Sequence, residues 1–173
     1  MMPVILIVLG VLVLTIVYGI GIYNRLVSVK NEVDKAWANI DVLLQQRHDE
    51  LPKLVEVCKQ YKQFEQQTLQ QVIAARGQVQ TARENRDVSS LGQADGLLHS
   101  GLGKLFAIAE AYPDLKANAS FMQLQTRISQ LENAIADRRE LYNEAVNINN
   151  VRIEQFPDRL FANTFHFEAR RLL

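Results

Sequence analysis

Few side chains in this 173-residue sequence could do metal or nucleophilic chemistry. The three histidines are His48, His99 and His166, and the one cysteine is Cys58. Zinc sites bring such ligands together, commonly at short spacings along the chain, and none of these four residues is paired in that way. Cys58 lies on an apolar helical stripe, where we expect an inert buried thiol and not a nucleophile.

The densest ionisable cluster is His48, Asp49 and Glu50, just before Pro52. A histidine beside two carboxylates could act in general acid–base catalysis, so an enzyme that uses this cluster is one hypothesis. Solvated residues around a proline bend explain the same pattern, and we favour that explanation. The glycines are not followed by the Gly-Lys-Ser/Thr ending of a phosphate-binding loop. The sequence therefore predicts no cofactor, no metal and no catalytic residue.

The overall charge argues against a nucleic-acid partner. The chain has 19 basic and 19 acidic side chains and an isoelectric point near 6.8, whereas nucleic-acid-binding domains carry an excess of positive charge. With 48% apolar and 22% charged residues, the composition is that of a folded protein and not of a disordered polymer.

Residues 4–23 contain no charged side chain, and 16 of these 20 residues are apolar. A helix needs about 17–25 such residues to cross the hydrocarbon core of a bilayer. A cleaved signal peptide would have basic residues before the apolar run and small residues after it, and neither is present. We therefore predict a short tail at residues 1–3 and a retained membrane helix at residues 4–23, with the bilayer as a partner. Membrane-spanning positions along it include Val4, Leu9, Leu14, Tyr18 and Tyr23.

Lys and Arg close to the membrane are enriched on the cytoplasmic side. In this sequence Arg25, Lys30 and Lys35 all follow the apolar run. We therefore expect a cytoplasmic body with the N-terminus outside, and the opposite orientation is the alternative.

The rest of the chain has apolar residues at helical spacings of three and four. The fold class is therefore all-α, with the membrane helix followed at residues 24–156 by an elongated antiparallel up-and-down bundle of three or four long helices. The spacing favours one kinked helix from residue 24 to about 84, then helices at about 90–112 and from about 121 to 155. Proline disrupts helix interiors, so a turn between two helices at Pro52 is the alternative to a kink.

Two surface segments are candidates for recognition. Residues 112–116 form a predicted loop with Tyr112, Pro113, Asp114 and Lys116; they could dock a partner or simply end one helix and start the next. The tail at residues 157–173 is aromatic and basic. It could pack on the bundle or lie in the lipid headgroup region, through Phe161, Phe165, Phe167, Arg170 and Arg171.

Several blocks of this sequence resemble the LemA family. The first is Tyr23-Asn24-Arg25-Leu26-Val27, and the second runs from Arg47 to Val55 as Arg-His-Asp-Glu-Leu-Pro-Lys-Leu-Val. The most specific is Ala-Glu-Ala-Tyr-Pro-Asp-Leu-Lys-Ala-Asn at residues 109–118. The resemblance implies a bacterial inner-membrane protein with one N-terminal membrane helix, an up-and-down helical bundle and no assigned enzymatic activity. It also places a turn near Pro52. Some members are encoded beside membrane metalloproteases, which implies a conceivable partnership.

Together these patterns predict a non-enzymatic, single-pass, membrane-anchored scaffold that forms homo-oligomers. Confinement to a membrane raises the effective concentration of copies, so weak lateral contacts suffice. The alternative is an adaptor for a membrane protease or an envelope-stress system that docks through residues 112–116.

Overall fold

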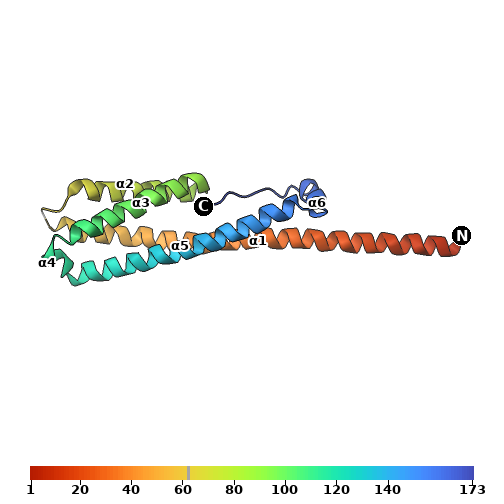
Figure 1. Ribbon diagram of the computed structural model, residues 1–173, viewed down its shortest axis with the longest axis horizontal. Coiled ribbons are helices and arrows are strands. Elements are labelled where there is room, and N and C mark those ends of the chain that lie inside the picture. Colours follow the sequence, from red (N-terminus) through yellow and green to blue (C-terminus); the bar gives the residue numbers. More distant parts are fainter. Residues whose placement is uncertain (62) are drawn as a thin grey trace.

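The computed structural model describes residues 1–61 and 63–173, and within them every regular element is a helix (Figure 1). The predicted all-α class is thus confirmed. The helices are α1 (Met2–Lys59), α2 (Gln66–Glu84), α3 (Val88–Ala109), α4 (Pro113–Lys116), α5 (Ala119–Glu154) and α6 (Asp158–Thr164).

The molecule is a long rod built from two antiparallel helix pairs (Figure 1). Helix α1 packs along α5, and α2 packs along α3 at the end of the rod farthest from the N-terminus. The 58 residues of α1 extend for about 87 Å at 1.5 Å per residue. Its N-terminal part projects alone, and α6 folds back beside the point where the bundle begins.

The predicted apolar stripes form the core of the bundle. Side chains from all four long helices are at most 5% exposed in one continuous cluster. Representative members are Ile40, Leu51, Leu69, Leu105 and Ile128.

One glycine of α3 explains a close contact between α2 and α3. A Cβ on Gly101 would lie 3.3 Å from Val72 of α2, so the absent side chain lets the two helices approach.

Pro52 lies inside α1, which continues through it to Lys59. The absence of an N–H on proline leaves the carbonyl four residues earlier, that of His48, without its usual helical donor. Arg76 of α2 supplies one, because its Nε donates to the His48 oxygen at 2.9 Å. This tertiary hydrogen bond satisfies the exposed acceptor, and the helix survives its proline. The alternative of a turn at Pro52 is therefore wrong.

The predicted continuation of that helix to residue 84 is also wrong, because α1 ends at Lys59 and α2 begins at Gln66. The reversal is made by short-range hydrogen bonds, including Tyr61 N to Cys58 O at 3.1 Å. It is fixed by Phe64, which is 2% exposed and packs 5.5 Å from the ring of Tyr112. Burial of one aromatic ring, not glycine or proline, thus makes the turn.

Candidate functional site

The structure contains one helix, among the described residues, that is long and apolar enough to cross a membrane. Its apolar window near the N-terminus is only 6% buried within the molecule, and Leu14, for example, is 71% exposed. A core helix of a water-soluble protein would be mostly covered by its neighbours. Residues 4–23 are therefore a candidate membrane anchor, continuous in one helix with the first bundle helix.

Helix α6 touches this anchor at its bundle end. The Phe161 ring packs so closely on Gly19 that a Cβ there would lie 3.2 Å from it. Tyr23 makes edge contacts with Phe165 and Phe167 at centroid distances of 4.9 and 5.9 Å. We call Gly19, Tyr23, Phe161 and Phe165 the membrane-proximal patch. Because Gly19 lies within the apolar run, these aromatic rings lie beside the last turns of the candidate anchor.

The basic residues that follow the anchor all lie on the surface. Arg25, Lys30 and Lys35 are exposed, and Lys35 is 3.9 Å from Glu32 in a loose surface pair.

The C-terminal tail beyond α6 lies along α5 (Figure 1). Its main chain is held by side chains of α5, for example by Asn150, whose Nδ2 donates to the Arg170 oxygen at 2.8 Å. The side chains of Arg170 and Arg171 are exposed, whereas Phe161 and Phe167 are half-buried against the start of the bundle. Phe165 remains 52% exposed beside the anchor.

Residues 112–116 lie at the end of the rod opposite the anchor (Figure 1), and the predicted loop contains the short helix α4. Tyr112 is half-buried, and its hydroxyl donates to the Gln63 oxygen at 2.6 Å. It therefore ties the α3–α4 junction to the α1–α2 turn. Pro113, Asp114 and Lys116 are exposed.

A buried ion network joins three helices in the middle of the bundle, and the sequence analysis missed it. Arg47 of α1 is 1% exposed and forms ion pairs with Asp95 of α3 and Glu132 of α5. Asp95 also pairs with Arg139 of α5, and His99 Nδ1 lies 2.7 Å from Glu132. We call these five residues the ion network. Its sequence signal is Arg47 itself, which occupies an apolar-stripe position between Leu44 and Leu51.

The two carboxylates keep the buried Arg47 charged. Burial by itself lowers the pKa of Arg47, but the negative charges of Asp95 and Glu132 and their hydrogen bonds outweigh it, so the pKa is raised. The guanidinium thus stays charged in the core. A buried charge that is this well paired is costly to expose or to leave alone.

The residues of the predicted acid–base cluster are engaged with separate partners. His48 Nε2 lies 2.6 Å from Arg76 Nη2, Asp49 accepts from Gln45 at 2.8 Å, and Glu50 pairs with Lys53. Burial, then the positive charge of Arg76, lowers the pKa of His48. The three side chains do not converge on one point.

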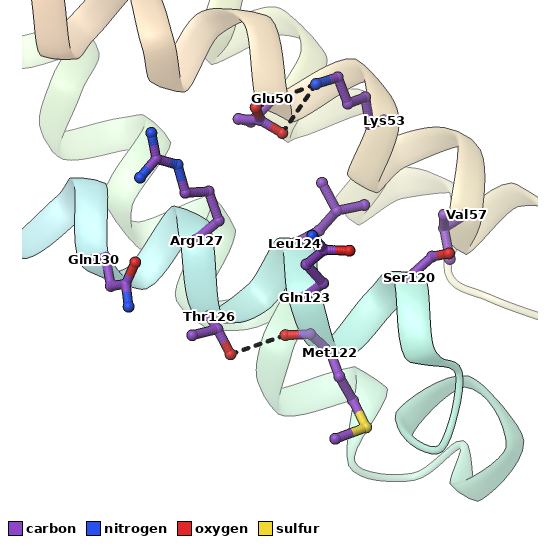
Figure 2. Close-up of a pocket in the computed structure, with 10 residues that line it drawn as sticks. All are labelled: Glu50, Lys53, Val57, Ser120, Met122, Gln123, Leu124, Thr126, Arg127 and Gln130. Carbon is purple, nitrogen blue, oxygen red and sulfur yellow. Dashed lines mark hydrogen bonds and ion pairs between the residues drawn. The ribbon is translucent and has the colours of Figure 1, made fainter.

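A groove between α1 and α5 lies near this cluster. Figure 2 shows Glu50 and Lys53 on one wall, paired with each other, and Met122, Leu124 and Arg127 on the other.

Cys58 is fully buried, and burial raises its pKa to about 12. Within residues 1–61 and 63–173, no three His, Cys, Asp or Glu side chains form a group that could hold a metal.

Comparison with known protein families identifies the family of this chain. The model of the LemA family matches residues 36–173, which include the ion network and the tail. The chain belongs to the LemA family. The matched range begins after the candidate anchor, which therefore rests on its own composition and exposure.

The similar proteins are distant relatives of this chain. Protein LemA of Metamycoplasma hominis is 29% identical over 137 residues, covering 79% of this chain and 62% of that protein. Magnetosome protein MamQ 2 of Paramagnetospirillum magneticum is 25% identical over 158 residues, covering 78% of this chain and 58% of that protein. This LemA-family chain thus spans about three fifths of the length of these relatives, and their names specify no reaction.

Proposed function

We propose that this LemA-family protein is a non-enzymatic, single-pass scaffold of the bacterial inner membrane, whose bundle stands off the bilayer as a stiff rod and forms homo-oligomers there. The observation that carries the proposal is the continuity of α1 from residue 2 to 59. One uninterrupted helix transmits the direction of the anchor to the bundle, so neighbouring copies stand side by side.

The membrane-proximal patch supports a second contact with lipid. Phe161 and Phe165 stand against the last turns of the anchor, and Arg159 of α6 is exposed. Aromatic rings at the acyl boundary with arginine nearby are the arrangement of interfacial helices. We propose that α6 lies in the headgroup region and steadies the rod.

The anchor itself is tested by washing membranes with alkaline carbonate. An anchored chain stays with the membrane pellet and keeps residues 4–23. Release of the whole chain into the supernatant, or loss of these residues by cleavage, overturns the proposal.

The proposed orientation puts the bundle in the cytoplasm, as Arg25, Lys30 and Lys35 favour. A Met122→Cys variant offers an exposed thiol at the far end of the rod, because Met122 is 54% exposed. The native Cys58 is buried and gives little background. A membrane-impermeant maleimide should label the variant only after the cells are opened. Labelling of intact cells places the bundle outside.

The oligomer is tested by measuring particle mass in mild detergent over a wide range of protein concentrations. We expect a mass above that of one chain at the higher concentrations. A single chain per particle at every concentration contradicts self-association.

A second candidate, an adaptor for a membrane protease or an envelope-stress system that docks through residues 112–116, rests on the exposed Asp114 and Lys116 at the end of the rod farthest from the anchor. Alanine at both positions, with Tyr112 kept because it holds the fold, should abolish co-purification of a co-expressed protease. Unchanged recovery of the protease counts against the adaptor.

A further inference from the structure

Four side chains of α5 hold the main chain of the tail by six hydrogen bonds. Asn143 and Asn150 each make two: Asn143 Nδ2 donates to the main-chain oxygen of Leu173 at 2.9 Å and its Oδ1 accepts from Leu173 N at 2.8 Å. Asn150 pairs in the same way with Arg170, at 2.8 Å in both directions. The others come from Asn149 to the Glu168 oxygen at 3.3 Å and from Tyr142 to the Arg171 oxygen at 3.0 Å. We call Tyr142, Asn143, Asn149 and Asn150 the tail clamp.

The clamp is matched to an extended peptide by its spacing. Seven residues of helix separate Asn143 from Asn150, a rise of about 10.5 Å. The three residues from Arg170 to Leu173, in extended conformation, span about 10 Å. Each carboxamide, with one acceptor oxygen and two N–H donors, pairs with both main-chain groups of one residue. The tail thus runs antiparallel to α5, in register with a heptad.

The clamp binds the main chain and does not contact most of the tail side chains, although Arg170 Nη2 lies 3.7 Å from Asp34 Oδ1 of α1. Residues 168–172 are exposed, whereas Leu173 is half-buried against the core and lies 3.9 Å from where a Cβ on Gly92 would be. The ligand class is therefore an extended segment with free N–H groups and an apolar side chain at one end. The sequence that meets these requirements here is the protein's own tail.

The joint before the tail is strained. His166 adopts φ 57°, a left-handed conformation that residues other than glycine rarely adopt. Beyond the joint, the seven residues 167–173 are about 23 Å long when extended. Strained joints next to a detachable segment favour exchange of that segment between copies, because every hydrogen bond is kept and the strain is released.

We propose that copies of this protein exchange tails in the membrane, so that the tail clamp of one copy holds residues 168–173 of its neighbour. The idea rests on the proposed anchoring, which sets neighbouring clamps at one height above the bilayer and raises their effective concentration. Exchange between two copies is reciprocal, each copy giving a tail and receiving one, as in a two-fold symmetric dimer.

Two full-length variants test the exchange by complementation. The clamp variant, Asn143→Ala with Asn150→Ala, keeps its tail but cannot hold one. The tail variant, Arg170→Pro, keeps its clamp but lacks the N–H that Asn150 accepts and the side chain that pairs with Asp34. Each is expressed with two different tags in membranes, solubilised in mild detergent and assayed by co-purification. Asn147→Ala, an exposed asparagine on the same helix, is the matched control.

We expect wild type and Asn147→Ala to co-purify with themselves, and each of the two variants alone to lose at least tenfold. Mixing the clamp variant with the tail variant should recover about half of the wild-type signal, because one of the two exchanges is restored. Helicity measured by circular dichroism shows that the variants are folded, and Asn150→Ala alone replaces the pair if helicity falls.

Other outcomes overturn the proposal in distinguishable ways. If both variants self-associate like wild type, exchange is wrong while the oligomer remains. If each variant fails and the mixture also fails, the tail acts only within its own chain. If wild type does not self-associate, the oligomer and the exchange fall together.

Discussion

The ion network and the tail clamp are both built from polar groups, but of different kinds. In the ion network, Arg47 is buried among carboxylates from two other helices. In the tail clamp the hydrogen bonds are neutral; Asn143 and Asn150 are only half-buried, whereas Tyr142 and Asn149 are buried. A buried ion pair that opens leaves charge in the core, whereas an amide at the surface can exchange its partner for water at little net cost.

This difference suits the ion network to holding the helices together and the tail clamp to releasing the tail in the proposed exchange. The ion network joins α3 to the α1–α5 pair and fixes how these three helices meet. In the proposed exchange, the tail clamp releases its segment while the ion network keeps that arrangement. A scaffold that exchanges tails needs both: a rigid body and a detachable end.

The largest expected effect is on the ion network. Asp95→Ala removes the carboxylate between Arg47 and Arg139, leaving two guanidinium groups with one acidic partner fewer. We expect the free energy of unfolding to fall by about 3–5 kcal/mol, the usual cost of breaking a buried pair. Urea unfolding in detergent, followed by circular dichroism, measures it. The matched control is Glu50→Gln, whose partner Lys53 is largely exposed; it should cost less than about 1 kcal/mol. Equal costs for the two variants would contradict the role assigned to the network.

The next effect concerns the proline in α1. Arg76→Ala leaves the His48 carbonyl without its donor and should cost about 1–3 kcal/mol. In a Pro52→Ala background the new N–H of residue 52 takes over that carbonyl, so the same arginine substitution should cost less. Unfolding free energies of the four proteins in this double-mutant cycle measure the coupling. Additive costs would show that Arg76 does not compensate for the proline.

Much of this architecture can be predicted from local sequence. Residues such as Ile40, Leu51 and Ile128 recur at helical spacing, and they form the core. Local sequence also identified the apolar run at residues 4–23, since an uncharged apolar stretch of that length is typical of a membrane helix. Helix α5 was predicted nearly to its ends because its apolar pattern is long and its stop, Phe156-Pro157, is strong.

What the sequence did not predict depends on contacts between distant segments. Arg47 interrupts the apolar stripe, and its burial makes sense only with Asp95 and Glu132 beside it. The turn after Lys59 lacks glycine and proline, and the apolar phase runs on across it, so Phe64 gave no local signal. The tail clamp binds main-chain atoms, which are the same in every sequence, so Asn143 and Asn150 looked like ordinary surface residues.

A smaller effect tests the membrane end directly. Gly19→Leu puts a side chain into the Phe161 ring and should detach α6 at a cost of about 1 kcal/mol, the low end for overpacking. Gly10→Leu is the matched control, because a Cβ there has no neighbour within 4 Å among the described residues. Trypsin cleavage after the exposed Arg159, followed by mass spectrometry in detergent, should be roughly fivefold faster for Gly19→Leu only, the factor that about 1 kcal/mol gives. Equal cleavage rates would mean that α6 does not depend on the anchor.

The smallest effect is a pH dependence of the free energy of unfolding, caused by the contact of His48 in α1 with Arg76 in α2. Burial and the charge of Arg76 lower the pKa of His48 in the folded protein; Arg83 lowers it further, and Asp49 and Glu84 oppose the shift. The unfolded chain therefore binds the proton more readily, so stability is full above the ordinary histidine pKa of about 6.5 and declines as the pH falls below it. Protonation also removes the acceptor that Nε2 offers to Arg76, which weakens the bond to the helix that carries Pro52. Urea unfolding at pH 7.5 and 5.5 should show a decline in wild type that is smaller in His48→Gln. The same decline in both proteins would assign the pH dependence to groups other than His48.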